Sequence, residues 1–127
     1  MQKRARDYHA VIIYMASRIG LFFGRHSAQW QLMPRFTTRV ELQGATREDY
    51  MRLQSAMERR GFSRTIKSDE GIVYVLPDAE YDREDDTLTA DLVLNDAIGA
   101  TRTVTEQFSV LVTEAVRRMW SRLPTAK

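Results

Sequence analysis

The sequence predicts an α+β domain over residues 33–127, in which a four-stranded antiparallel sheet carries two helices on one face. The order of predicted elements, strand, helix, strand, strand, helix, strand, is the first observation behind this prediction. The second is a composition of 43% hydrophobic and 28% charged residues, which is typical of a globular domain. The third is the length of 127 residues without a cysteine, which favours one modest domain without disulfide bonds.

The first strand and the first helix have the clearest patterns. Residues 36–42 alternate strictly between apolar or β-branched side chains and polar ones, which predicts a half-buried strand. A helix is predicted over residues 46–60, because apolar residues then recur at helical spacing. Thr46 and Asp49 have the spacing of a capping box at its start, and Gly61 stands where a C-terminal cap is expected.

Two short strands are expected next, over residues 62–67 and 72–76. The polar turn at 68–71 between them predicts an antiparallel hairpin, and Pro77 ends the second strand. Residues 78–86 contain six carboxylates and one arginine, and this composition predicts a solvated loop.

The last third of the body completes the predicted order. A second helix is predicted over residues 87–98 with Gly99 as its stop, although residues 88–92 also fit a strand. An apolar, β-branched run predicts a strand over 107–113, and a short basic helix is expected over 114–123. The whole is the ferredoxin-like βαββαβ arrangement. The sheet face without helices must then meet water, an extra element or another chain.

Residues 1–32 form a basic, partly apolar N-terminal extension. They carry a net charge of +4, from five basic side chains and one acidic, whereas residues 33–127 carry fourteen basic and sixteen acidic side chains. The sequence leaves three interpretations open: a secretory signal, an amphipathic helix at a membrane surface, or sequence upstream of a start at Met33. No transmembrane helix is expected, because no uncharged apolar stretch approaches about 18 residues.

The placement of histidine limits the chemistry of the body. Both histidines, His9 and His26, lie in the extension, so imidazole and thiol catalysis are excluded for residues 33–127. No nucleotide-binding glycine motif or zinc-protease motif occurs. Three options are left: carboxylates that hold a divalent metal, carboxylate–arginine phosphoryl chemistry, or no catalysis.

Two sets of carboxylates are candidates for such a site. Glu41 at the end of the first strand and Asp49 a few residues later could share a metal ion. The alternatives are a solvent-exposed side chain for Glu41 and helix capping for Asp49. The acidic run 78–86 could bind Mg²⁺ or Ca²⁺, but it lacks the order of an EF-hand loop.

Basic and aromatic side chains suggest contacts with RNA. The cations gather at the end of the first helix and on the next strand, where they could contact phosphates or only complement the helix dipole. Aromatic rings could stack on single-stranded bases or belong to the core. The candidate cations are Arg39, Arg59, Arg60, Arg64 and Lys67, with Arg52 earlier on the helix, and the aromatic residues are Tyr74, Tyr81 and Trp120.

Residues 33–123 resemble a known protein family. The segments MPRFTTRVEL, DYMRLQSAMERRGFSRTI, DEGIVYVLPDAEY and FSVLVTEAV, which is followed by Trp120, are similar to the GhoS-like family of endoribonuclease antitoxins of type V toxin–antitoxin systems. The resemblance implies a ferredoxin-like fold like that of small CRISPR-associated nucleases. It also implies a cytoplasmic protein that cleaves the messenger RNA of its toxin, a small membrane-lytic peptide.

The resemblance also implies roles for individual residues. Those nucleases carry an aspartate near the end of the first strand, where Glu41 and Asp49 are the nearest acids, and Arg52 aligns with an arginine of the antitoxin helix. Glu41, Asp49 and Arg52 are therefore the candidate catalytic residues, with or without a divalent metal.

Three functions follow from these observations. The first is an RNA-directed antitoxin endoribonuclease. The second is a non-catalytic ferredoxin-like module, expected to be a homodimer, that binds a protein or RNA partner in mobile-element defence or counter-defence. The third is an adaptor that contacts a membrane surface through residues 1–32.

Overall fold

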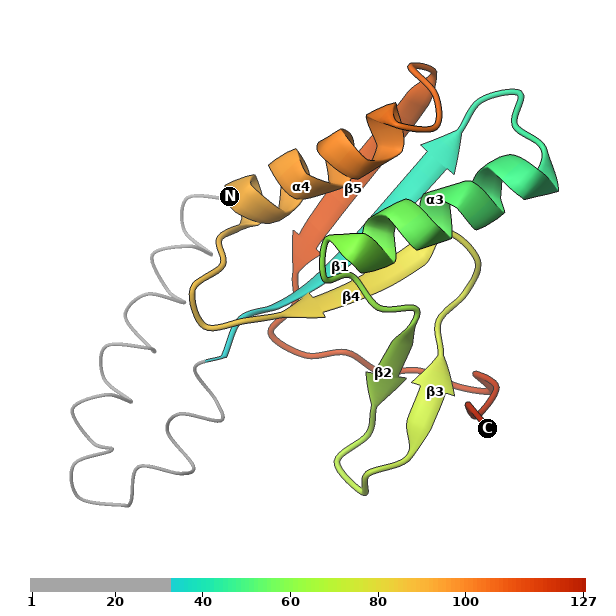
Figure 1. The fold of residues 1–127 in the computed structure, drawn as a ribbon. Coiled ribbons are helices and arrows are strands. Elements are labelled where there is room, and N and C mark those ends of the chain that lie inside the picture. The colour runs from blue at the N-terminus through green and yellow to red at the C-terminus, as the bar shows by residue number, and fades with distance from the viewer. Residues whose placement is uncertain (1–32) are drawn as a thin grey trace. The chain divides into compact units, whose positions relative to one another are not determined.

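A computed structural model describes residues 33–127, and the predicted N-terminal extension lies outside the described residues. Figure 1 shows two helices lying across one face of a sheet and a separate small hairpin. In chain order the elements are β1 (Arg35–Leu42), α3 (Arg47–Arg59), β2 (Thr65–Lys67), β3 (Val73–Val75), β4 (Glu80–Glu84), α4 (Ala90–Arg102) and β5 (Phe108–Glu114).

The sheet differs in detail from the predicted four-stranded one. A three-stranded antiparallel sheet has the order β4-β1-β5, and β2 and β3 form a separate two-stranded antiparallel sheet. A single bridge between Ser63 and Asp82 connects the segment before β2 to β4. The predicted α+β class with two helices and antiparallel strands is confirmed. The second strand is shorter than predicted because only residues 65–67 pair with β3.

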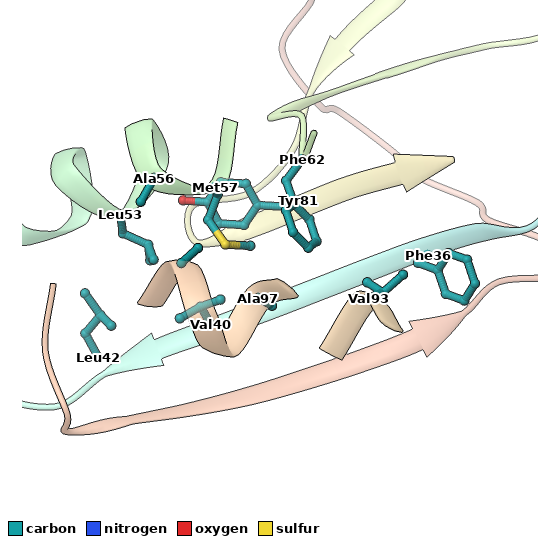
Figure 2. Packing of buried hydrophobic residues seen from close by; sticks show 11 residues of the cluster. Phe36, Val40, Leu42, Leu53, Ala56, Met57, Phe62, Tyr81, Val93 and Ala97 are labelled. Atoms are coloured by element: carbon teal, nitrogen blue, oxygen red, sulfur yellow. The ribbon is translucent and has the colours of Figure 1, made fainter. Parts of the chain in front are cut away.

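The hydrophobic core lies between the sheet and the two helices. The alternation predicted for the first strand is confirmed, because Phe36, Thr38, Val40 and Leu42 are all buried while Arg39 and Glu41 between them are exposed. Figure 2 shows side chains of both helices interleaved with those of β1 and β4. The buried cluster consists of Phe36, Val40, Leu42, Leu53, Ala56, Met57, Phe62, Tyr81, Val93, Ala97 and Ala100.

Helix α3 begins and ends as its sequence predicts. The backbone N–H of Thr46 donates to Oδ2 of Asp49 at 2.9 Å, and the N–H of Asp49 donates to Oγ1 of Thr46 at 3.2 Å. This reciprocal pair satisfies two backbone donors that the first turn leaves without helical partners. Gly61 follows the helix with φ of +89°, a conformation that glycine adopts without steric cost.

The acidic run 78–86 is not the solvated loop that its composition predicts. Residues 80–84 form β4, which pairs with β1 along five residues. Tyr81 and Asp82 are buried at 2% and 6% exposure. Because neighbouring strand residues point to opposite faces, Tyr81 enters the core while the carboxylates beside it point away. The single apolar residue in this strand gave too weak an alternation to stand out from its charge.

Helix α4 is also displaced from its predicted position. It begins after Thr89, whose side chain accepts a hydrogen bond from the N–H of Leu92, and it continues through Gly99 to Arg102. Gly99 therefore does not stop the helix. A Cβ at this position would lie 2.5 Å from Nη1 of Arg60, so the glycine leaves room for the arginine that crosses the helix.

The predicted helix over residues 114–123 is absent. Residues 115–127, here called the C-terminal strap, leave the end of β5 and run to the edge of β3 (Figure 1). The backbone of the strap pairs at both ends: the N–H of Ala115 donates to the carbonyl of Arg35 at 2.8 Å, and that of Ala126 donates to Val73 at 2.9 Å. These pairings hold the strap extended, and a helix would break them.

Candidate functional site

The predicted catalytic residues Asp49 and Arg52 are close together, but they stabilise the start of α3. One carboxylate oxygen of Asp49 accepts from the backbone of Thr46 and the other accepts from Nη2 of Arg52. The hydrogen bond from Thr46, followed by the one from Arg52, lowers the pKa of Asp49 below its ordinary value. Helix capping, the alternative for Asp49, is therefore what the structure shows.

Glu41 lies away from this pair. It pairs in register with Ser109 of β5 and is exposed on the sheet face opposite the helices, here called the open face. Asp49 belongs to the helix that covers the other face, so the structure does not bring the two carboxylates together. Among residues 33–127, no group of three or more acidic, histidine or cysteine side chains is placed to hold a metal ion.

Arg64 holds a loop together instead of facing solvent. Its guanidinium donates to the carbonyl oxygens of Pro77 and Glu80 at 2.6 and 2.5 Å, and to that of Leu76 at 2.9 Å. It also lies 5.6 Å from the centre of the Tyr81 ring. With only 14% of its side chain exposed, Arg64 uses its donors to fix the turn between β3 and β4.

Arg60 joins the two helices. Its Nη1 lies 3.9 Å from Oδ1 of Asp96 on α4, and the other oxygen of that carboxylate accepts from Nη1 of Arg83 at 2.5 Å. Arg83 also lies over the ring of Phe62, with 5.1 Å between its guanidinium carbon and the ring centre. One aspartate thus fixes the end of α3 and strand β4 against α4.

The remaining predicted cations are on the surface. Arg59, Lys67 and Arg39 are exposed, on α3, β2 and β1 respectively. Arg39 lies on the open face, opposite Leu111 of β5 and Glu80 of β4 in the strand register. Arg52 and Arg60 are exposed as well, with 67% and 43% of their side chains accessible beside their aspartate partners, so among the predicted cations only Arg64 is largely buried.

The candidate stacking residues differ in exposure. Tyr81 is in the core, at 6.4 Å from Phe62 between ring centres, so of its two predicted roles the structure shows the core one. Burial raises the pKa of its hydroxyl to about 12. Tyr74 and Trp120 contact each other edge to face with 5.5 Å between ring centres, which fastens the C-terminal strap to β3.

A buried ion pair on the open face was not predicted. Arg118 of the strap reaches Oδ1 of Asp82 at 2.5 Å, with side-chain exposures of 15% and 8%, and its Nη1 lies 3.5 Å from Oγ1 of Thr37. Beside it, burial, together with the charge of Asp82, raises the pKa of Glu84. The signal in the sequence was the alternation of carboxylates in the acidic run, which places both acids on one face of a strand.

Apolar side chains are exposed on β5 and at the start of the strap. Leu111 on the open face of β5 is 64% exposed, and Val116 and Met119 at the start of the strap are 72% and 77% exposed. Arg118 of the strap contacts Thr37 of β1 and Asp82 of β4 on the open face. Leu111 of β5 lies on the other side of β1 and, with Arg39 and Glu41, belongs to the exposed part of this face.

Comparisons of this chain with models of known families, with curated proteins and with solved structures give no match. In the part of the chain that the structure describes, neither helix has the length and hydropathy needed to cross a membrane. The similarity of residues 33–123 to the GhoS-like family stays a prediction from the sequence.

Proposed function

We propose that this chain is a non-catalytic, ferredoxin-like module that self-associates through the exposed part of its open sheet face. The observation that carries the proposal is the exposure of Leu111. This aliphatic side chain is 64% exposed in the middle of β5, the strand at one edge of the three-stranded sheet. Covering this leucine with a partner removes apolar surface from water and so lowers the free energy.

The ferredoxin-like topology is supported by the strand order. In such a fold the sheet has the spatial order fourth, first, third, second strand. Strands β5, β1 and β4 take the first three places, and the backbone of Ser63 exchanges two hydrogen bonds with Asp82, of 2.8 and 2.7 Å, in the fourth place. The β2–β3 hairpin is then an extension of the second strand.

The absence of catalysis is supported by how the predicted side chains are engaged. Asp49 and Arg52 cap a helix, Arg64 binds three carbonyl oxygens, and Glu41 lies on the face away from Asp49. A carboxylate–arginine site needs groups that converge on one reacting atom, whereas Asp49 and Arg52 bind each other at a helix start, Arg64 is directed to carbonyl groups and Glu41 lies on another face.

Two measurements on the full-length protein test the proposal. Light scattering should give a dimer, and incubation with labelled single-stranded RNA, with and without Mg²⁺, should leave the RNA intact. A monomer over the accessible concentration range overturns self-association, and RNA cleavage that follows the protein through purification overturns the non-catalytic assignment.

The second candidate is the RNA-directed antitoxin endoribonuclease that the GhoS-like resemblance implies. It is favoured by the open face, where Glu84, a carboxylate of raised pKa, belongs to the same strand as Asp82 and the exposed residues Arg39 and Glu41 lie on β1. A perturbed carboxylate close to arginines is a common feature of catalytic sites.

Cleavage assays with variants distinguish this candidate. If the chain cleaves RNA at this face, Glu84→Gln and Glu41→Gln should reduce the rate at least tenfold, while Glu48→Gln on α3 should not. Binding should weaken steeply with salt, because phosphate contacts release counterions. If the protein neither cleaves the toxin messenger RNA nor binds it at low salt, the candidate is eliminated.

A further inference from the structure

We propose that the C-terminal strap is a displaceable internal ligand, and that the surface beneath it is a binding site for an extended peptide segment that carries an arginine. The strap occupies this site in the free protein and must leave before such a partner can bind. The site is different from the surface around Leu111, so this inference goes beyond the proposed self-association and does not depend on it.

The strap is attached to the domain outside its hydrophobic core. Among residues 33–127, neither the buried core cluster nor the apolar side chains packed against it include a residue of the strap. Val116 and Met119 are 72% and 77% exposed, so these two apolar side chains contribute little to holding the strap. A segment with little buried apolar surface opens locally at a lower free energy than the core does. The strap can therefore detach while the sheet and both helices stay folded.

Arg118 makes the first contact of the strap, with the carboxylates of β4. Its Nη1 makes both hydrogen bonds, to Oδ1 of Asp82 at 2.5 Å and to Oγ1 of Thr37 at 3.5 Å. Its Nε is buried and has no acceptor among residues 33–127. Glu84 lies two residues beyond Asp82 on the same face of β4, and its charge interacts with that of Arg118. A guanidinium that binds a carboxylate through two nitrogens is held more strongly than one that leaves a buried donor unpaired, so an arginine of a partner can compete for this position.

Tyr74 on β3 provides the second contact. Its ring packs edge to face against the ring of Trp120, with 5.5 Å between the ring centres. Arg118 and Trp120 are partly buried, whereas Met119 between them is exposed, which is the alternation of an extended segment. The site therefore contacts one face of an extended chain, and it selects an arginine and an aromatic ring two residues apart.

Strand β3 provides the third contact, through its backbone. The N–H of Val75 donates to the carbonyl oxygen of Pro124 at 2.8 Å, and the carbonyl oxygen of Val73 accepts from the N–H of Ala126 at 2.9 Å. The end of the strap thus lies antiparallel beside the β2–β3 hairpin (Figure 1). Backbone pairing with the edge of a sheet gives affinity for any extended segment, and side-chain contacts give specificity. In this site the specificity comes from the arginine and aromatic contacts.

The path of the strap between these contacts is strained. Arg122 has φ of +62°, which is uncommon for a residue with a Cβ and costs free energy. A separate peptide has no covalent link to β5, so it can reach the same contacts along a less strained path. The strain of the internal ligand therefore favours its exchange for a partner.

Hydrogen exchange in the full-length protein tests whether the strap detaches by itself. The N–H of Val75 is bonded to Pro124 of the strap, whereas the N–H of the next residue, Leu76, is bonded to the carbonyl of Arg64 before β2, each at 2.8 Å. The protection factor of the Val75 amide should be at least about tenfold lower than that of the Leu76 amide. Equal protection of the two amides would mean that the strap opens only together with the hairpin, and it would overturn the proposal.

A synthetic peptide of residues 115–127 tests the site with a ligand that is not part of the chain. The receptor is the full-length protein with Arg118→Gln, which weakens the internal ligand and leaves Asp82 in place. In fluorescence anisotropy, the labelled peptide should bind this variant at least about tenfold more tightly than it binds the parent protein. Circular dichroism checks that the receptor is folded. If Arg118→Gln does not fold, Trp120→Ala weakens the strap at its aromatic contact and takes its place as the receptor.

Two further peptides of equal charge distinguish the arginine contact from a general attraction between basic peptides and carboxylates. The peptide with Arg118→Gln should bind at least about tenfold more weakly than the original, whereas the peptide with Arg117→Gln, at a position that is exposed in the strap, should bind as the original does. Absence of binding to the receptor, or equal weakening by the two substitutions, would overturn the site. These results do not depend on the oligomeric state, so a protein that is monomeric in light scattering overturns self-association alone.

Discussion

The two faces of the central sheet are stabilised in different ways by the same strand. On the helix face, β1 contributes Phe36, Val40 and Leu42 to a core that both helices close. On the open face, the neighbouring residues are polar, and an arginine from a distant segment neutralises a buried aspartate. Packing thus specifies one face and charge pairing the other, so substitutions on the two faces should destabilise the fold for different physical reasons.

The largest effect is expected on the helix face. Leu53→Ala removes a side chain that is completely buried, and it should lower the free energy of unfolding by about 3 to 4 kcal/mol. Urea denaturation measures this change, with Met51→Ala on the exposed side of the same helix as control. Equal losses in the two variants would mean that α3 does not pack as described.

The next largest effect is expected at the ion pair on the open face. Arg118→Met leaves Asp82 buried without its cation, and the free energy of unfolding should fall by about 2 kcal/mol. The neighbouring exposed Arg117→Met serves as the control. The double variant Asp82→Asn with Arg118→Met should recover part of the loss. Failure to recover would indicate that Arg118 stabilises the strap by contacts other than this pair.

A smaller loss is expected at the turn between β3 and β4. Arg64→Met removes three hydrogen bonds to carbonyl oxygens and should cost about 1 to 2 kcal/mol, whereas Arg59→Met should change stability by less than about 0.5 kcal/mol. Thermal denaturation compares the two variants. Similar melting temperatures in the two variants would contradict a structural role for Arg64 and leave it available to contact phosphates.

The smallest effect is expected at Glu84, and it has the opposite sign. Its pKa is raised by burial and by the charge of Asp82, so the ionised form destabilises the fold and stability from this group is lost as the pH rises through that pKa. Glu84→Gln should therefore raise the melting temperature at pH 7 by about 2 °C, since solvent screening keeps the gain near 0.5 kcal/mol. The gain should vanish below about pH 4, where glutamate is protonated.

The elements with strong periodicity were predictable from the sequence. Strand β1 and helix α3 have local patterns and a capping box that tertiary contacts do not override. Strand β4 was missed because one tyrosine among charged residues gives little alternation, and only pairing with β1 reveals it. The end of α4 was misplaced because the role of Gly99 depends on Arg60, a residue 39 positions earlier.

The candidate site was less predictable than the fold. Helix capping by Asp49 was foreseen as an alternative because it depends on residues three apart. The engagement of Arg64 with carbonyl groups, and that of Arg118 with Asp82, joins segments 12 to 36 residues apart, and no local pattern encodes such contacts. A prediction from clusters of charge in the sequence therefore overestimates the number of cations that are available to a ligand.

The pairing of Asp82 with Arg118 also has a consequence for biosynthesis. Asp82 leaves the ribosome 36 residues ahead of its partner, so a nascent chain carries an unneutralised aspartate in its central sheet until the strap emerges. During that interval both helices can already dock on the sheet, because every residue of the core cluster precedes the strap. The open face is thus completed late in synthesis, and strand β5 is translated shortly before the strap.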